Sequence, residues 1–282
     1  MNESIGSLLD KHAGTLSQVS DSPRLDCQLL LGHVLGKGRD WLFAHSDEPL
    51  DCRDQSRLAE LIRRRQNGEP VAYLVGKKGF WNREFEVSPS TLIPRPETEL
   101  LVELALARFD KQPRQVLDLG TGTGALAVTL AAERPDWQLL AVDIDPDAVE
   151  VARRNAADLT NISIIEGNWF TGITQVFDLI VSNPPYIAEE DPHLDALVFE
   201  PVRALASGAD GLDAIRAIIN HASEHLAEGG HLLLEHGYDQ QVTVVQILSH
   251  AGFTEIETFE DLSGQPRAVL AKNTGAAIDH DE

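Results

Sequence analysis

Four residues near the middle of the chain have the types and order needed to hold a planar NH2 group: Asn183, Pro184, Pro185 and Tyr186. The Asn side-chain carbonyl and the backbone carbonyl of the first proline can together accept both hydrogens of one amino group. Two consecutive prolines fix φ and remove two N–H donors, so these acceptors stay in place. The tyrosine ring offers a flat face to a flat substrate. The motif predicts group transfer to a weakly nucleophilic nitrogen, such as an amide or an exocyclic base amine. The alternative is a proline-rich turn without chemistry.

The placement of this motif also indicates a ligand site. An apolar run over residues 177–181 comes just before it and is typical of a buried strand. Open α/β sheets bind their ligands outside the carboxyl ends of strands. We therefore expect residues 183–186 at the carboxyl edge of a sheet.

A glycine-rich turn upstream is a second candidate ligand site. An apolar run over residues 116–119 predicts a short buried strand, and an alanine-rich stretch over residues 125–132 predicts a helix. The turn between them consists of Gly120, Thr121, Gly122, Thr123 and Gly124. Glycines permit positive φ and let a ligand come close to the backbone. The pattern predicts a strand, a ligand-binding turn and the start of a helix.

A carboxylate on the next strand fits a nucleoside ligand on this turn. Asp143 ends the apolar run over residues 139–142, 23 positions after Gly120. A carboxylate there can accept hydrogen bonds from both ribose hydroxyls. The glycine spacing alone also satisfies the dinucleotide pattern G-x-G-x-x-A, so it leaves a dinucleotide site open. The combination of Asp118, Asp143 and the later amide-holding motif favours a cofactor that serves group transfer.

Several motifs resemble those of a known enzyme family. Residues 118–124 (Asp-Leu-Gly-Thr-Gly-Thr-Gly) and 183–186 are similar to S-adenosylmethionine-dependent N-methyltransferases, which include adenine-N6 methyltransferases of DNA or RNA and protein glutamine-N5 methyltransferases. Residues 93–99 (Ile-Pro-Arg-Pro-Glu-Thr-Glu) and 69–74, with Gly76, resemble the HemK/PrmC family of the second group. Those enzymes methylate the glutamine of the Gly-Gly-Gln motif in class 1 peptide chain release factors. The resemblance covers nearly the whole chain and weakens before residue 20 and after residue 272.

The resemblance implies a role for each candidate residue. S-adenosylmethionine would be the cofactor, with its methionine and ribose parts on the glycine turn, its ribose hydroxyls on Asp143 and its adenine beside Trp169. Asn183 would face both the cofactor and the target amide. The substrate pocket would be completed by Pro184, Pro185 and Tyr186.

Two positions near the expected site have open roles. Asn168 stands where such methyltransferases commonly carry an Asp, and its carbonyl can still accept from the adenine amino group, so we expect a modest change in affinity. Glu97 and Thr98 either close over the cofactor or form the N-cap of a helix over residues 99–109.

The order of predicted elements indicates an α/β protein. From about residue 90, strands and helices alternate, which favours a parallel sheet. The resemblance implies a Rossmann-like class I methyltransferase domain, with a mostly parallel seven-stranded sheet and an antiparallel last strand. A fifth strand is expected over residues 231–235, after the break at Gly229 and Gly230, and the last two over residues 255–259 and 267–271.

Four parts are expected along the chain. Residues 1–75 form a helical bundle that recognises the substrate, with Leu25, Leu29 and Leu30 on one buried face of a helix over residues 24–35. Alternation over residues 80–87 predicts a β-hairpin in a linker over residues 76–90. The methyltransferase domain occupies residues 91–274. The end of the chain, residues 275–282, is expected to be a disordered acidic tail.

The charge of the chain discriminates between substrates. The net charge is −22, and residues 71–282 carry 14 Lys and Arg against 34 Asp and Glu. Proteins that hold a nucleic acid along a groove use Lys and Arg to displace its counterions. An acidic surface fits a protein loop that bears basic residues, so we expect release factors as partners and no direct nucleic-acid contact.

Composition favours a cytoplasmic protein, and we expect a monomer without a metal. No apolar run approaches the span of a bilayer, and residues 1–10 have neither a basic nor an apolar signal segment, so we expect no membrane contact. Cys27 and Cys52 lie near no Cys or His at ligand spacing.

Other functions explain only part of these features. A nucleic-acid adenine methyltransferase would need a basic recognition region, and a nucleotide-dependent oxidoreductase would leave residues 183–186 unused. A module that only binds S-adenosylmethionine would gain nothing from the amide-holding motif. A glutamine methyltransferase of a ribosomal protein shares that motif but usually lacks the Pro-Glu-Thr-Glu segment.

Overall fold

The computed structural model describes residues 3–275, so the predicted tail lies outside the described residues apart from Gly275. The chain divides into two compact units, Met1–Lys77 and Lys78–Glu282, which we call the helical unit and the sheet unit. Within residues 3–275, none of the helices combines the length and the apolar character needed to cross a bilayer.

The helical unit is built from short helices around one leucine-rich core. Its elements are α1 (Ile5–Leu16), α2 (Pro23–Leu35), α3 (Arg39–Ala44), α4 (Cys52–Gln66) and α5 (Val71–Val75). The predicted buried face of α2 was partly wrong: Leu30 is buried as expected, but Leu29 is 40% exposed, and Cys27, Leu31 and Val34 lie in the core. The buried stripe is rotated because α2 packs against α1, α4 and α5 together.

A β-hairpin opens the sheet unit. Its strands β1 (Lys77–Phe80) and β2 (Arg83–Glu86) flank a turn at Trp81, whose φ is 55°. The strands lie earlier than the alternation over residues 80–87 suggested, because Trp81 turns the chain and packs against the sheet unit. Its backbone N–H donates to Glu99 Oε1 at 2.7 Å, and its indole N–H donates to Glu133 Oε1 at 2.9 Å.

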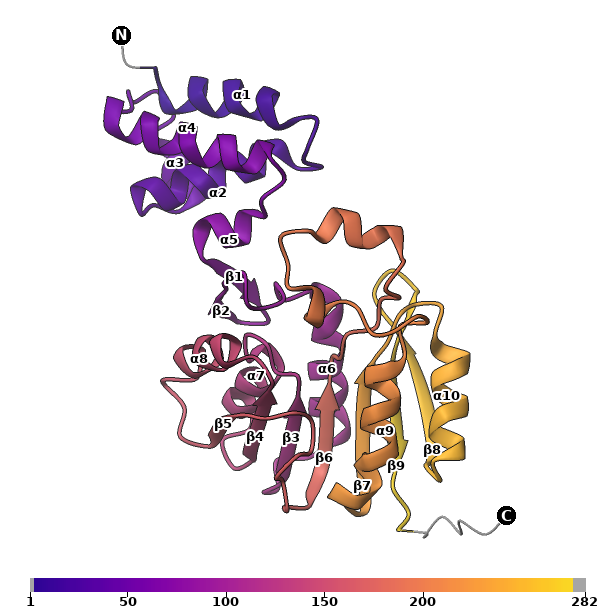
Figure 1. The fold of residues 1–282 in the computed structure, drawn as a ribbon. Coiled ribbons are helices and arrows are strands. Elements are labelled where there is room, and N and C mark those ends of the chain that lie inside the picture. The colour runs from indigo at the N-terminus through magenta and orange to yellow at the C-terminus, as the bar shows by residue number, and fades with distance from the viewer. Residues whose placement is uncertain (1–2, 276–282) are drawn as a thin grey trace. The chain divides into compact units, whose positions relative to one another are not determined.

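Strands and helices alternate through the rest of the sheet unit (Figure 1). The strands are β3 (Gln115–Leu119), β4 (Gln138–Asp143), β5 (Ile162–Glu166), β6 (Phe177–Ser182), β7 (Leu226–Glu235), β8 (Thr254–Glu260) and β9 (Pro266–Lys272). The α-helices are α6 (Glu99–Arg108), α7 (Ala125–Glu133), α8 (Pro146–Asn155), α9 (Asp213–His225) and α10 (Gln241–His250). Short 3-10 helices are η1 (Pro96–Thr98), η2 (Pro192–Leu197) and η3 (Val202–Ala204).

The sheet has the topology that the resemblance implied. Its seven strands run in the order β5-β4-β3-β6-β7-β9-β8. Strand β9 pairs antiparallel with both β7 and β8, and the other neighbouring pairs are parallel. The predicted α/β fold class is thus confirmed. One strand differs from the expectation: β7 begins at Leu226 and runs through Gly229 and Gly230, with a register shift where it pairs with β6.

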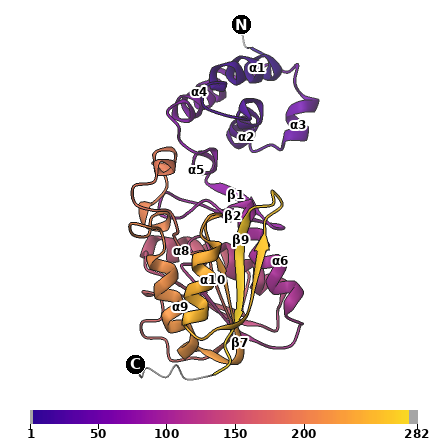
Figure 2. The same ribbon diagram turned by 90° about the vertical axis from the view of Figure 1, so that its right-hand side faces the viewer.

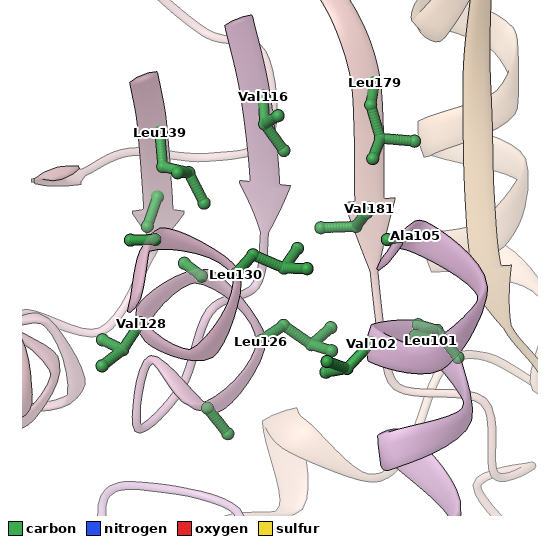
Figure 3. Close-up of a cluster of buried hydrophobic side chains, with 14 of the residues drawn as sticks. Leu101, Val102, Ala105, Val116, Leu126, Val128, Leu130, Leu139, Leu179 and Val181 are labelled. Carbon is green, nitrogen blue, oxygen red and sulfur yellow. The ribbon is translucent and has the colours of Figure 1, made fainter. Parts of the chain in front are cut away.

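Helices cover both faces of this sheet. One core joins the strands to α6, α7 and α8, and the other joins them to α9 and α10, which lie on the opposite face (Figure 2). Successive residues alternate between the cores, as Val116 and Leu117 do. Figure 3 shows the first core, where Leu and Val side chains of α6 and α7 meet those of β3, β4 and β6. Strands buried on both faces hold their carboxyl ends rigidly.

Candidate active site

Four neighbouring strands bring residues of the predicted motifs and Glu235 to one edge of the sheet. Gly120 follows β3, Asp143 ends β4, Asn183 follows β6 and Glu235 ends β7. Since these strands are parallel neighbours, all four residues lie at their carboxyl ends. The sequence motifs that were far apart along the chain therefore meet at one place.

Hydrogen bonds to β4 fix the shape of the glycine turn. The N–H groups of Gly120 and Thr121 both donate to the carbonyl of Val142, at 2.9 and 3.0 Å. Gly122 has a φ of 56° and donates its N–H to Asp143 Oδ2 at 2.8 Å. The left-handed conformation is easy for glycine and strained for other residues. Asp143 thus anchors the turn as well as bordering the space above it.

A cavity lies over this turn, and we call it the glycine-turn cavity. Most predicted cofactor residues line it, namely Gly120, Thr121, Gly122, Thr123, Asp143, Trp169 and Asn183, together with Asn168 and Pro185. Gly124 is not among its lining residues. A Cβ on Gly124 would lie 3.0 Å from Val128 and 3.3 Å from Ala152, so this glycine permits close packing of α7 and α8.

Trp169 forms a flat wall of the glycine-turn cavity. A Cβ placed on Gly120 would lie 3.5 Å from this ring, in ordinary contact, so it is the φ of 70° at Gly120 that favours glycine there. The backbone of Trp169 has a φ of 48°, which is uncommon for a residue with a large side chain. A planar base stacked beside this ring would be held by its apolar face.

Asp118 presents an unpaired oxygen at the same cavity. Its side chain is 1% exposed, and its Oδ2 accepts from the Thr121 hydroxyl at 2.6 Å, while its Oδ1 has no partner. Burial raises the pKa of Asp118 to about 7. A buried carboxylate oxygen without a donor is costly unless a ligand supplies one. The cavity therefore fits a ligand with a cationic or N–H-bearing group.

A second cavity adjoins the first, and we call it the Tyr186 pocket. Its lining residues are Leu92, Arg95, Glu97, Asn183, Pro184, Tyr186, Ile187, Leu197, Ala204, Leu205, Glu235 and Arg267. Four of them, including Asn183, also line the glycine-turn cavity. Asn183 therefore stands where the two cavities meet, and the predicted motif is split between them, because Pro185 borders the first cavity and Pro184 and Tyr186 the second.

A hydrogen-bonded group, which we call the Glu235 network, lies behind Asn183. Asn183 Nδ2 donates to Thr98 Oγ1 at 2.9 Å, and the Thr98 hydroxyl donates to Glu235 Oε2 at 2.7 Å. The Tyr186 hydroxyl donates to the other carboxylate oxygen at 3.1 Å. Thr98 occupies the N-cap position of α6, as one interpretation expected, but its side chain makes no capping bond. Its hydroxyl is drawn to Glu235 instead.

The segment between β6 and α9 contributes to both cavities. Arg203 and Ala204 line the glycine-turn cavity, and Leu197 and Ala204 line the Tyr186 pocket. Arg203 forms an ion pair of 3.3 Å with Asp145 across the first cavity. Glu200, which is 6% exposed, binds the Arg95 guanidinium and accepts from the backbone N–H of Ile93 at 3.1 Å. These contacts tie the segment to the residues before α6.

Comparisons with known proteins agree with this geometry. Residues 7–76 match the model of the PrmC N-terminal domain, and residues 96–209 match that of the methyltransferase small domain. The release factor glutamine methyltransferase of Salmonella typhimurium is 47% identical over 260 residues, which cover 90% of this chain and 94% of that protein. The enzyme of the same name from Vibrio cholerae is 48% identical over 259 residues, covering 90% and 91%. The chain belongs to the release factor glutamine methyltransferase family.

A solved structure supports the fold. A methyltransferase from Pyrococcus furiosus matches with a TM-score of 0.54 at 20% identity, covering 78% of this chain and all of that chain. Membership of the family confirms the HemK/PrmC resemblance, and this chain is an S-adenosylmethionine-dependent methyltransferase. The residues that line the glycine-turn cavity fit that cofactor: Asp118 would offer an oxygen to its ammonium group, Asp143 would accept from the ribose hydroxyls, and Trp169 would lie beside adenine.

Two of the residues around Asn183 were not identified from the sequence. Thr98 was interpreted as either a lid or a helix cap, and Glu235 was not singled out at all. Glu235 did carry a signal, because it is an acidic residue at the end of an apolar strand. Nothing in the sequence pairs it with Thr98, which lies 137 positions away.

Replacing Asp118 by Asn is expected to change the pH dependence of stability. Because burial raises the pKa of Asp118 from 3.8 to about 7, the folded chain binds this proton more tightly than the unfolded chain. The group's stabilising contribution is therefore full below pH 4 and is lost as the pH rises through 7. In the absence of cofactor, Asp118→Asn should be more stable than the wild type at pH 8, on the order of 2 kcal/mol.

Urea unfolding of both proteins at pH 5 and pH 8 measures this effect. The advantage of the variant should be larger at pH 8. An advantage that is equal at both pH values would mean that the Asp118 carboxyl does not titrate differently on folding.

Proposed function

We propose that this chain transfers the methyl group of S-adenosylmethionine to the side-chain amide nitrogen, N5, of the glutamine in the Gly-Gly-Gln motif of class 1 peptide chain release factors. The observation that carries the proposal is that Asn183 borders both the glycine-turn cavity and the Tyr186 pocket. A residue at such a junction can touch the donor methyl group and the acceptor amide at once. The names of the relatives support release factors as the substrate.

The residues of the pocket would act by orientation. S-adenosylmethionine would supply a sulfonium methyl group: the target nitrogen would attack its carbon in line with the C–S bond, which breaks so that the sulfur keeps the bonding electron pair. Asn183 and the Pro184 carbonyl would accept the two N–H groups of the target amide. This turns the face of the nitrogen toward the methyl group and favours the positive charge that grows there. The methylated nitrogen then loses one of its two protons to water.

The Tyr186 pocket supports an amide of a protein side chain as the acceptor. Tyr186 and Leu197 offer apolar surface to a side-chain stem, while Arg95 and Glu97 add polar groups at its wall. A flat amide between the Tyr186 ring and Pro184 would be held in one plane. Correct placement of donor and acceptor can supply several kcal/mol of the barrier.

Substrate recognition and catalysis would be carried out by different parts of the chain. We infer that residues 1–75 form the substrate-recognition bundle, that residues 76–90 form the hairpin linker, and that residues 91–274 form the catalytic domain. The excess of acidic residues over residues 71–282 favours basic protein partners over nucleic acid. The proposal places the enzyme in the cytoplasm, as a monomer, where release factors meet the ribosome.

Incubation with methyl-labelled S-adenosylmethionine tests the function. A purified class 1 release factor should take up one methyl group, and mass mapping should place it on the glutamine of the Gly-Gly-Gln motif. A release factor whose motif glutamine is replaced by alanine is the matched control and should stay unlabelled. Label on a ribosomal protein or on nucleic acid from a whole-cell lysate, with none on the factor, would reject the proposal.

A further inference from the structure

We propose that Thr98 and Glu235 are positioning residues that fix the orientation of the Asn183 amide, so that its carbonyl oxygen and not its NH2 group faces the substrate. This inference rests on the proposed function for its kinetic consequence. Its structural basis is the Glu235 network, which can be tested without any substrate.

The direction of the hydrogen bonds follows from the carboxylate. An ionised carboxylate has no hydrogen to donate, so the Thr98 hydroxyl must donate to Glu235, at 2.7 Å. The Thr98 oxygen is then left with lone pairs, which can only accept from Asn183 Nδ2, at 2.9 Å. With its nitrogen engaged on this side, Asn183 presents Oδ1 on the other. The Glu235 carboxylate therefore determines that the oxygen of the Asn183 amide, and not its nitrogen, faces the ligand.

Burial makes this arrangement strongly preferred. Glu235 is 1% exposed and Thr98 is 5% exposed, so neither can replace a lost partner with bulk water. If the Asn183 amide turned over, its oxygen would face the Thr98 oxygen, and its NH2 group would face the NH2 group of the target glutamine. The first contact would have no hydrogen-bond donor and the second would have no acceptor, so both are unfavourable.

The second oxygen of Glu235 holds the other end of the motif. The Tyr186 hydroxyl donates to Glu235 Oε1 at 3.1 Å, so Asn183 and Tyr186 are both tied, directly or through Thr98, to the same carboxylate. Glu235, at the end of β7, thereby sets the positions of Asn183 and Tyr186, which lie in the loop after β6. Neither Thr98 nor Glu235 needs to touch the reacting atoms for this role.

Protonation of Glu235 would disturb the network. Burial raises its pKa to about 7, with the nearby Glu97 acting in the same direction and Arg267, Thr98 and Tyr186 opposing it. His236, the next residue, is buried, and burial lowers its pKa, which disfavours a positive charge beside Glu235. A protonated carboxyl would donate a hydrogen toward Thr98 or Tyr186 and remove an acceptor. Activity that depends on the network should therefore fall as the pH drops below 7.

The test compares Thr98→Val, which keeps the shape and removes the hydroxyl, with Thr98→Ser, which keeps the hydroxyl. With the release factor as substrate, Thr98→Val should lower kcat by about 10²-fold, the order expected for a misplaced catalytic group. Thr98→Ser should stay close to the wild type. Thr98 also lines the glycine-turn cavity, so the affinity of both variants for S-adenosylhomocysteine is measured in parallel. A fall in kcat at saturating cofactor that exceeds any change in this affinity shows an effect on Asn183 and not on the cofactor cavity.

A pH profile tests the part played by Glu235. In Glu235→Gln, the amide oxygen can still accept from Thr98 while its NH2 group donates to the Tyr186 hydroxyl. We therefore expect this variant to keep substantial activity but to lose the part of the acid-side fall in kcat that the wild type shows around pH 7. A merely structural Glu235 would not give this change of profile.

Nuclear magnetic resonance of the side-chain amides gives a readout that needs no substrate. With 15N-labelled asparagine, and assignment by comparison with Asn183→Ala, the Asn183 NH2 protons should exchange slowly in the wild type and in Thr98→Ser, and fast in Thr98→Val. Fast exchange in the wild type would overturn the inference, as would equal losses of kcat in the Val and Ser variants or none in either. If the wild type leaves the release factor unmethylated, the proposed function fails, while the amide signals still decide the network.

Discussion

Asn183→Ala is expected to lower kcat for methylation of the release factor by about 10²- to 10³-fold, the loss seen when one preorganised polar group is removed from an active site. The side chain stands where the glycine-turn cavity meets the Tyr186 pocket, so its loss removes one of two acceptors for the target NH2 group. Affinity for the cofactor should change little, because Asp118, Asp143 and Trp169 remain. Single-turnover methylation with saturating cofactor and release factor measures the effect.

Asn168→Ala is the matched control for this prediction. Asn168 is also an asparagine in the wall of the glycine-turn cavity, but it does not line the Tyr186 pocket. Its removal should alter cofactor affinity more than kcat. Wild-type turnover in Asn183→Ala would remove the amide-holding motif from the mechanism.

A second large loss is expected from Asp143→Ala, this time in cofactor affinity. The carboxylate accepts from the backbone N–H groups of Gly122, at 2.8 Å, and Asp145, at 2.9 Å, so it shapes the glycine turn. It also lines the glycine-turn cavity, where it would accept from the ribose hydroxyls. Hydrogen bonds to a charged group contribute about 1.5 to 3 kcal/mol each, so the Kd for S-adenosylmethionine should rise by roughly 10²-fold or more.

Isothermal titration with S-adenosylhomocysteine measures this change. Asp147→Ala is a suitable control, because Asp147 is an exposed carboxylate in the first turn of α8 that does not line the cavity. It removes the same charge a few residues away and should leave the Kd unchanged. Equal affinities of Asp143→Ala and the wild type would place the ribose elsewhere.

The sequence predicted those parts of the fold that depend on local patterns. The apolar runs before Gly120, Asp143 and Asn183 are strands in the structure, because buried parallel strands carry apolar side chains on both faces. The glycine turn and the amide-holding motif meet at one sheet edge because the strands before them are adjacent and parallel. For the same reason, most predicted cofactor residues line one cavity.

The remaining features depend on contacts between distant segments. Leu29 turned out to face solvent because the packing partners of α2, and not its own periodicity, choose the buried side. Thr98 is a residue type that is common at helix N-caps, yet its hydroxyl binds Glu235, which lies on a strand 137 positions later. A local pattern carries no information about such a partner. The network around Asn183 could therefore be found only in three dimensions.

The occupied nitrogen of Asn183 also has a consequence for selectivity. Since that nitrogen is engaged by Thr98, the two groups proposed to bind the target NH2 group are both oxygen atoms, from Asn183 and Pro184. A glutamine side chain can donate two hydrogen bonds to these oxygens, whereas the negative charge of a glutamate would be repelled by them. A release factor whose motif glutamine had been deamidated would thus bind poorly in the pocket. Only chains that still carry the intact amide would be methylated.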